Sequence, residues 1–338
     1  MSTQEPMETA DRDGLLVLSA ADVTQVFDMD TAIESQRVAF RELGLGHAQL
    51  PARLLLSGPE GSSSFCYAAR VSDETGAVCK FGSAAPANAE RGLPTIAAVV
   101  TALDPQTGRP VALMDGTTVT TIRTSAASAV AAEALARPES SVLAVLGSGV
   151  QAEAHVKALA RVLPLSDVRV WGRTAAKAEQ LVARLAERFD FDVSVARDPQ
   201  VAVAGADVVV AATTSATPVL EVEWLAPGAT VISVGSFAAD RSEVPVELLR
   251  RAAAVVVDDV ETSLEHAGPV VAAVHENVLG AGDLVSLGSV VAGLSSGRSG
   301  PEDIVFYNSV GIGVQDAAAA WAVITAARER GLGQQISL

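Results

Sequence analysis

Residues 142–155 constrain the fold more than any other stretch of the chain. Val142–Leu146 is a run of five apolar residues, typical of a fully buried strand, and a helical pattern begins soon after it. The turn between them reads Gly-Ser-Gly-Val-Gln-Ala, the Gly-x-Gly-x-x-Ala form of the dinucleotide-binding fingerprint. Its glycines allow a tight turn and a close approach of pyrophosphate, while the helix N-terminus offers free N–H groups. We therefore expect cofactor contacts at Gly147, Ser148, Gly149, Val150 and Gln151.

The second strand of this unit indicates which dinucleotide is bound. NAD-binding units usually end this strand with an acidic residue that binds the ribose 2′-OH. Here the strand ends at Trp171-Gly172, and the polar residues that follow are Arg173, Thr174 and Lys177. A guanidinium can pair with a 2′-phosphate and stack on adenine. We predict NADP(H) in preference to NAD(H); the alternative is that Arg173-Thr174 is only a helix start.

The order of the predicted elements divides the chain into two parts. Up to residue 136, helical patterns accompany strand-like runs at residues 53–57, 63–71, 77–81, 95–103 and 110–114. From residue 141 onward strands and helices alternate, which indicates a doubly wound parallel sheet. We predict an α/β fold with a Rossmann domain over residues 137–308 and an α+β domain over residues 1–136 and 309–338.

Three local features complete this description. We expect residues 1–13 to be a loose tail. Asp30 is predicted to cap the helix that ends near Gly44. Residues 288–301, rich in Gly and Ser, are predicted to form a loop or domain boundary.

Charge and cysteine usage exclude several classes of function. The chain has 24 Lys and Arg residues and 40 Asp and Glu residues, so its net charge is −16. This negative charge disfavours nucleic-acid binding, because a phosphate backbone needs a basic surface. No apolar run is long enough for a membrane span. Cys66 and Cys79 are expected to be two buried thiols in a reducing compartment, so we predict a cytoplasmic protein. The four histidines do not form a ligand set, and we predict no metal.

A series of short motifs runs through nearly the whole chain after the tail. They lie at residues 50–53, 77–80, 92–95, 104–108, 114–116, 121–127, 147–152, 212–215, 309–311 and 315–319. Together they resemble the ornithine cyclodeaminase/mu-crystallin family. The resemblance implies a homodimer whose α+β domain binds substrate and forms the dimer interface, with a C-terminal helix that returns to that domain. It also implies an NAD(P)-dependent oxidoreductase that acts on the CH–NH or C=N bonds of amino or imino acids.

The resemblance implies that Arg53, Lys80 and Arg123 bind the substrate carboxylate and are the catalytic cations. Arginine suits a bidentate clamp and lysine a point charge, although surface ion pairs are the alternative for each residue alone. Lys80 lies in an apolar strand, where burial can lower its pKa into a range useful for proton transfer. Matching positions in the family imply further substrate contacts at Asn88, Thr95, Phe237 and Gly311, and further cofactor contacts at Thr213, Thr214, Ser236 and Val310. For Asn88 and Thr95, hydrogen bonding within a loop is an equal alternative.

Residues 234–243 depart from the cyclodeaminase pattern. Where cyclodeaminases place an Asp that acts on the substrate amine, this chain has Phe237, which cannot accept a proton; Asp240 lies three residues later. We therefore predict an NADPH-dependent reductase of cyclic ketimine acids, Δ1-pyrroline-2-carboxylate or Δ1-piperideine-2-carboxylate, that produces L-proline or L-pipecolate. The alternatives are an open-chain amino acid dehydrogenase similar to alanine dehydrogenase, an ornithine cyclodeaminase, and a non-catalytic NADPH-binding protein.

Overall fold

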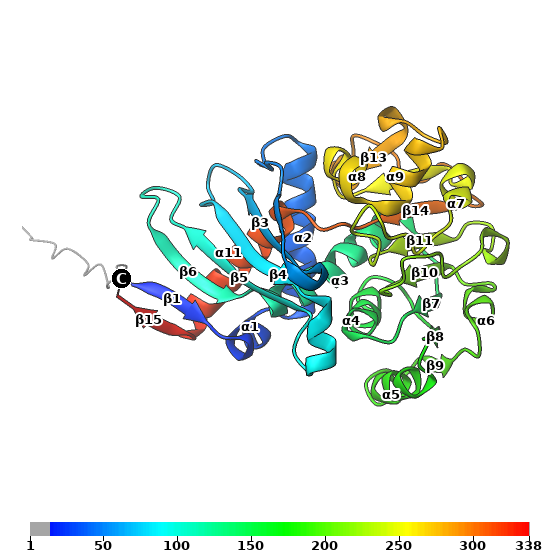
Figure 1. Cartoon of the computed structure of the whole chain (residues 1–338), viewed down its shortest axis with the longest axis horizontal. Coiled ribbons are helices and arrows are strands. Elements are labelled where there is room, and N and C mark those ends of the chain that lie inside the picture. The colour runs from blue at the N-terminus through cyan, green and yellow to red at the C-terminus, as the bar shows by residue number, and fades with distance from the viewer. Residues whose placement is uncertain (1–13, 338) are drawn as a thin grey trace, which may run out of the picture.

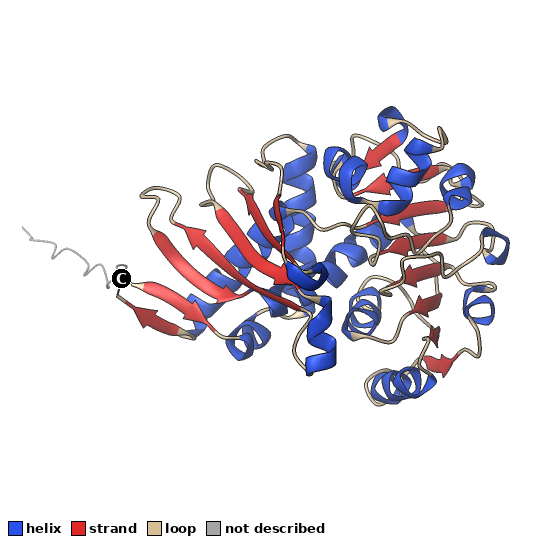
Figure 2. Ribbon diagram, in the orientation of Figure 1, coloured by secondary structure: helices blue, strands red, loops and turns tan. Residues whose placement is uncertain are grey.

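The computed structural model describes residues 14–337, which form two β-sheets with their helices (Figures 1 and 2). The predicted tail at residues 1–13 lies outside the described residues. The first sheet has seven strands in the order β15-β1-β6-β5-β4-β3-β2. β1 pairs with β6 in parallel, and the other pairs are antiparallel. Its strands are β1 (Leu15–Leu18), β2 (Leu54–Ser57), β3 (Ser63–Ala69), β4 (Val78–Ala84), β5 (Ile96–Leu103), β6 (Pro110–Asp115) and β15 (Gln334–Ile336).

The second sheet has eight parallel strands in the order β13-β12-β14-β11-β10-β7-β8-β9. Its central strands are buried on both faces, which explains why they appear in the sequence as continuous apolar runs. The predicted doubly wound α/β fold is confirmed. The strands are β7 (Val142–Leu146), β8 (Asp167–Trp171), β9 (Asp192–Val195), β10 (Val208–Ala211), β11 (Thr230–Ser233), β12 (Ala254–Val257), β13 (Leu284–Ser286) and β14 (Val305–Asn308).

Helices cover both faces of the second sheet. In Figure 1, α4 and α8 lie on the side toward the first sheet, whereas α6 and α7 lie on the opposite side. The helices are α1 (Ala20–Val26), α2 (Met29–Gly44), α3 (Gly116–Leu135), α4 (Val150–Leu159), α5 (Ala175–Ala186), α6 (Pro199–Val203), α7 (Val246–Arg251), α8 (Val260–His266), α9 (Gly268–His275), α10 (Leu287–Val291) and α11 (Gly313–Arg330).

Two helices of small residues connect the two sheets. α3 is mostly buried and rich in Ala, Ser and Thr, so it packs closely on both α2 and α4. His155 Nε2 of α4 lies 2.9 Å from Ser128 Oγ of α3, and burial lowers the pKa of His155 to about 4. α11 follows β14 and then packs against β3, β4 and β5 of the first sheet. The proposed division at residues 136/137 and 308/309 stays a prediction.

The structure corrects two local predictions about helices. The cap of α2 is Asp28, whose side chain accepts a hydrogen bond from Thr31 N at 2.9 Å; Asp30 instead pairs with Arg161. Residues 287–291 form α10, where a loop was predicted. Its glycine, Gly288, serves close helix packing, because a Cβ there would lie 2.8 Å from Phe40 O and 2.9 Å from Gly44 N of α2. A glycine that permits contact between helices has the same sequence signature as one in a loop.

The cysteines are also less deeply placed than predicted. Cys66 and Cys79 are half-buried free thiols on the neighbouring strands β3 and β4, with their Sγ atoms 3.4 Å apart.

The short edge strands β1 and β15 were not predicted, because they have too few residues for a periodic pattern. Within residues 14–337, no helix combines the length and the apolar character that crossing a membrane requires.

Candidate active site between the two sheets

The fingerprint loop has the shape that a dinucleotide needs. Gly147 has φ +132° and its N–H donates to Trp171 O at 2.7 Å; a Cβ there would lie 2.4 Å from Ala212 O. A Cβ on Gly149, in contrast, would meet no described atom within 4 Å, so the space beside this residue is open. Val150 is 70% exposed at the start of α4, and Gln151 Oε1 is buried without a hydrogen-bond partner. These residues therefore fit a bound pyrophosphate.

The cations predicted to select NADP lie beside this loop. Arg173, Thr174 and Lys177 are exposed between the end of β8 and the first turn of α5. The side chains of Arg173 and Lys177 form no hydrogen bond or ion pair with the described residues. The Thr174 side chain does not cap α5 by a hydrogen bond. A Cβ on Gly172 would lie 2.6 Å from Ser148 Oγ, so the two loops are in contact. Two unpaired cations are thus available next to the fingerprint.

A buried carboxylate, Glu243, holds the two loops that carry the predicted cofactor residues Thr213 and Ser236, although nothing in the sequence indicated this role. Glu243 accepts hydrogen bonds from Thr213 N at 2.5 Å, Gly235 N at 2.6 Å and Ser233 Oγ at 2.9 Å. Burial raises its pKa, and these donors oppose the increase. Ser236 Oγ accepts the backbone N–H of Glu243 at 2.8 Å and is fully buried, so its hydroxyl has an internal role. Of the predicted threonines, Thr213 is half-buried and Thr214 is exposed.

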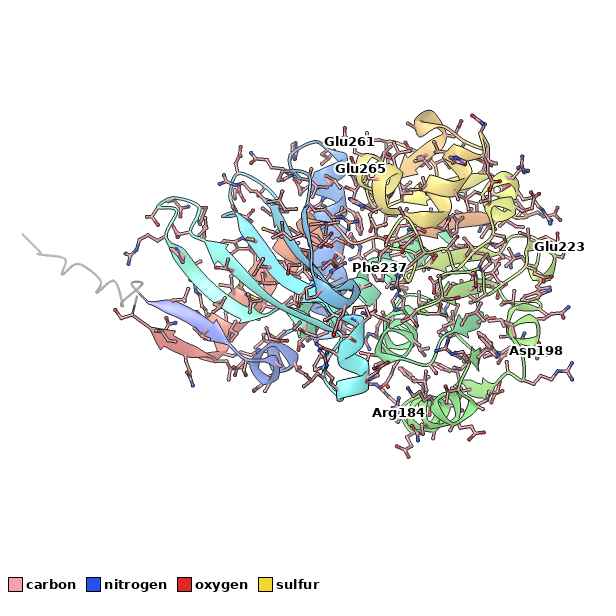
Figure 3. The ribbon with its side chains drawn as sticks, in the orientation of Figure 1. Arg184, Asp198, Glu223, Phe237, Glu261 and Glu265 are labelled. Atoms are coloured by element: carbon pink, nitrogen blue, oxygen red, sulfur yellow. The ribbon has the colours of Figure 1, made fainter. Side chains whose placement is uncertain are left out.

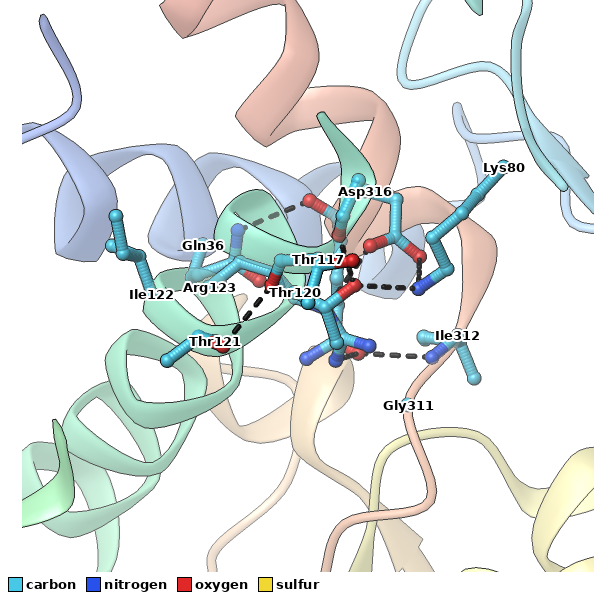
Figure 4. Close-up of polar contacts among 12 residues, drawn as sticks. Gln36, Lys80, Thr117, Thr120, Thr121, Ile122, Arg123, Gly311, Ile312 and Asp316 are labelled. Carbon is cyan, nitrogen blue, oxygen red and sulfur yellow. Dashed lines mark hydrogen bonds and ion pairs between the residues drawn. The ribbon is translucent and has the colours of Figure 1, made fainter. Parts of the chain in front are cut away.

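The predicted clamp residues Lys80 and Arg123 meet on one buried carboxylate, Asp316 (Figure 4). Lys80 Nζ of β4 lies 2.6 Å from Asp316 Oδ2, and Arg123 Nε of α3 lies 3.1 Å from Asp316 Oδ1. The three side chains are at most 5% exposed. Arg123 Nη1 also donates to Gln315 Oε1 at 3.0 Å. A strand and two helices therefore combine to build this ion cluster.

Burial and charge tune Lys80 for proton transfer. Burial lowers the pKa of Lys80 to about 8; Asp316 opposes this shift, while Arg123 and Arg53 add to it. The direction agrees with the prediction from its apolar strand. A lysine with such a pKa exchanges its proton readily near neutral pH.

Arg53 is the third cation near the cluster and contacts the same aromatic ring as Lys80. Its Nη1 donates to Tyr67 OH at 3.3 Å, and Lys80 Nζ lies 5.0 Å from the centroid of the same ring. Arg53 and Tyr67 line a small cavity together with Thr262 of α8 and Gly311. Lys80 thus lies between Arg53, with which it shares the Tyr67 ring, and Arg123, with which it shares Asp316, and three cations with one direct carboxylate partner are suited to an anionic ligand.

The structure does not bring every predicted substrate residue into this cluster. Asn88 Nδ2 donates to Pro94 O at 3.0 Å, and Thr95 O accepts from Ala85 N, so both residues have roles within their loop. Phe237 lies between the two sheets in Figure 3, is 39% exposed, and has the Arg241 guanidinium 5.5 Å from its ring centroid. Gly311, by contrast, lies directly against Arg123.

Several residues of the site were absent from the sequence prediction. Tyr67, Gln315 and Asp316 contact the cluster, and the detectable signal was a Gln-Asp pair at the start of an Ala-rich helix. A wider pocket around Trp171, Pro199 and Trp224 contains no cation of the cluster. Among the described residues, no group of three or more His, Cys, Asp or Glu is arranged to hold a metal.

A parallel sheet with the dinucleotide fingerprint, beside a buried cluster of two cations and one carboxylate, defines the class of this protein as an NAD(P)-dependent oxidoreductase. The chain belongs to the ornithine cyclodeaminase/mu-crystallin family, whose model matches residues 15–331.

Three relatives illustrate the range of the family. The chain is 32% identical to a Δ1-pyrroline-2-carboxylate reductase of Bacillus cereus over 95% of this chain and 99% of that protein. Its structure resembles Thermococcus litoralis Δ1-pyrroline-2-carboxylate reductase in complex with NADH and L-proline (TM-score 0.92, 30% identity, 95% and 100% of the two chains). It also resembles an archaeal alanine dehydrogenase dimer with bound NAD (TM-score 0.90, 34% identity, 95% and 98%).

Proposed function

We propose that this protein is an NADPH-dependent reductase of cyclic ketimine acids that forms L-proline or L-pipecolate. The observation that carries the proposal is the buried cluster of Lys80, Arg123 and Asp316, in which Arg123 lies against Gly311 in the segment that follows β14 of the dinucleotide sheet. Similarity to two pyrroline-2-carboxylate reductases supports the choice of an imine substrate. Phe237, which has no acid–base chemistry, supports a reductase over a cyclodeaminase.

The residues have distinct roles in this proposal. Arg53, Lys80 and Arg123 bind the substrate carboxylate, and protonated Lys80 also holds the proton that the imine nitrogen needs. Asp316 keeps Lys80 and Arg123 in position, and Phe237 provides an apolar wall for the ring. When bound, NADPH supplies the hydride for the substrate C2 carbon. The protein contributes orientation and neutralisation of charge.

Three parallel assays separate the candidate functions. Oxidation of NADPH is followed by absorbance, first with Δ1-pyrroline-2-carboxylate and then with pyruvate plus ammonia, and ornithine is tested for ammonia release. We expect turnover only in the first assay. Turnover with pyruvate and ammonia would instead support an alanine dehydrogenase, which the similarity to that enzyme favours as the second candidate. Cofactor binding without turnover would support a binding protein.

The proposed cofactor is NADP(H), although the solved relatives contain NADH or NAD. Arg173 and Lys177 support this proposal because they are exposed, unpaired cations next to the fingerprint. NAD(H) remains the competing cofactor. We also propose a cytoplasmic location, supported by the free thiols of Cys66 and Cys79.

We propose a homodimer formed by the outer face of the first sheet. Cross-strand pairing places Leu54, Cys66, Phe81 and Val99 in one row, on the face opposite Lys80. Three of these side chains are strongly exposed: Leu54 66%, Phe81 54% and Val99 45%. A row of exposed apolar side chains is typical of a protein interface, and the similar alanine dehydrogenase is a dimer. A second copy of this chain is the partner that fits.

Phe81→Asp should convert the dimer into a monomer, because it places a charge in the centre of this row. Light scattering after size-exclusion chromatography measures the mass. Val195→Asp is the matched control, since Val195 is 39% exposed on a strand of the second sheet. An unchanged dimer in Phe81→Asp would place the interface elsewhere.

A further inference from the structure

A second buried carboxylate, Asp258, has no role in the chemistry described so far. It lies directly after β12 and is fully buried. One oxygen accepts from Tyr307 OH, and the other accepts from Ser309 Oγ at 3.2 Å, Val310 N at 2.9 Å and Gly311 N at 2.7 Å. Burial raises its pKa, and these donors and Arg123 oppose the increase. Four donors on one buried carboxylate make a rigid attachment point.

The segment that Asp258 holds connects the two sheets. Residues 309–312 run from the end of β14, in the dinucleotide sheet, to α11, which carries Asp316. The successive N–H groups of Val310 and Gly311 both donate to one Asp258 oxygen, and Gly311 continues the chain with φ +79°, a conformation that favours glycine. This is the geometry of a backbone anion-binding nest, and the protein's own side chain occupies it.

Arg123 packs directly on this segment. A Cβ on Gly311 would lie 2.9 Å from Arg123 Nη2, so the guanidinium occupies the space where a side chain would be. Gln315 Oε1 accepts hydrogen bonds from both Arg123 Nη1 and Ile312 N, at 3.0 and 2.9 Å. The position of the guanidinium therefore depends on where the backbone at residue 311 lies (Figure 4).

We propose that Asp258 is a positioning residue for substrate binding: it holds the backbone at Val310 and Gly311 and thereby keeps Arg123 aimed at the substrate carboxylate. This inference rests on the proposed function. An Asn at this position would replace one carboxylate oxygen with an NH2 group. Tyr307 OH can accept from this NH2 group, but the Val310 and Gly311 N–H groups then donate to a neutral amide oxygen instead of a carboxylate, so the segment is held less firmly.

Asp258→Asn tests the proposal in the full-length protein with NADPH. We expect the KM for Δ1-pyrroline-2-carboxylate to rise about tenfold, whereas the KM for NADPH changes less than about twofold. We also expect the basic limb of the kcat/KM profile to move to higher pH. The charge of Arg123 lowers the pKa of Lys80, so a displaced guanidinium weakens that effect. A residue that only stabilised the fold would not shift this limb.

Two further variants are matched to this one. Asp259→Asn changes the neighbouring carboxylate, which caps α8 by accepting from Thr262 N at 2.9 Å, and Asn is an equally good cap. We expect wild-type kinetics from it. Gly311→Ala leaves Asp258 intact but pushes Arg123 away, so it should reproduce the rise in KM and the shift of the pH profile. It provides the test if Asp258→Asn does not fold.

Calorimetric titration with L-proline, with NADPH present, separates this inference from the proposed function. Weaker binding to folded Asp258→Asn, or to Gly311→Ala, supports the positioning role. Wild-type affinity and KM in both variants would overturn it. A wild-type protein that binds L-proline without reducing either cyclic ketimine acid overturns the proposed function alone, and one that binds neither L-proline nor L-pipecolate overturns both.

Discussion

Lys80→Ala should abolish imine reduction while NADPH binding stays near the wild-type level. The variant removes the buried ammonium that contacts Asp316 and, in our proposal, both binds the substrate carboxylate and holds the imine proton. Loss of a buried charge partner together with a proton donor reduces kcat/KM by about 10³-fold or more. Stopped-flow kinetics measures the chemical step, and fluorescence titration measures NADPH binding.

Variants of two lysines separate catalysis from general charge effects. Lys80→Met keeps a side chain of similar length and should be equally inactive, which excludes a simple packing defect. Lys157→Ala removes the partly exposed pair with Glu153 on α4 and should keep nearly full activity. A Lys80→Ala protein with wild-type turnover would refute the assigned role.

The same lysine sets the expected pH dependence of the wild-type enzyme. Because the pKa of Lys80 is lowered to about 8, the ammonium form predominates below that pH and is lost above it. The protonated form is the active one in our proposal, so kcat/KM should be constant below about pH 8 and fall as pH rises through it. The pH profile of the wild-type protein is measured alongside the kinetics of Lys80→Ala.

Arg173→Asp should reverse the cofactor preference. The wild-type guanidinium is exposed and unpaired beside the fingerprint loop, where it can bind a 2′-phosphate. The variant replaces this attraction with a carboxylate that repels phosphate but can accept the ribose 2′-OH of NADH. We expect the ratio of KM for NADPH to KM for NADH to rise about 100-fold, equivalent to about 3 kcal/mol.

Steady-state kinetics with both cofactors measures this ratio. Arg250→Asp, on the exposed surface of α7, makes the same change of charge away from the fingerprint and should leave the ratio unchanged. If Arg173→Asp also leaves it unchanged, Arg173 does not contact the 2′-phosphate. The result is specific to the cofactor, because Arg173 lies in the dinucleotide unit, separate from the cationic cluster.

The parts of the candidate site that are formed by residues close together in the sequence could be predicted. The fingerprint turn combines a strand, two glycines and a helix start within a few positions, and Gly147 has the positive φ that this turn needs. Lys80 was identifiable because a single cation interrupts an apolar strand, and the structure buries it. Asn88 and Thr95 stay predictions as substrate contacts: the structure shows Asn88 Nδ2 donating to Pro94 O and the backbone oxygen of Thr95 accepting from Ala85 N.

The sequence by itself determined the doubly wound fold and the dinucleotide loop, because local periodicity and a short motif encode them, and the family resemblance of its motifs pointed to the three cations. Only the tertiary structure decided which carboxylates support those cations. Arg123 and Asp316 are separated by 193 positions, and Asp258 and Gly311 by 53. No periodic pattern relates such residues. Arg123 and Asp316 meet because α11, which follows the parallel sheet, packs against α3 and the first sheet. Asp258 and Gly311 meet because β12 and β14 are neighbouring parallel strands that end at the same edge. Burial then makes the charges of Arg123 and Asp316 dependent on each other.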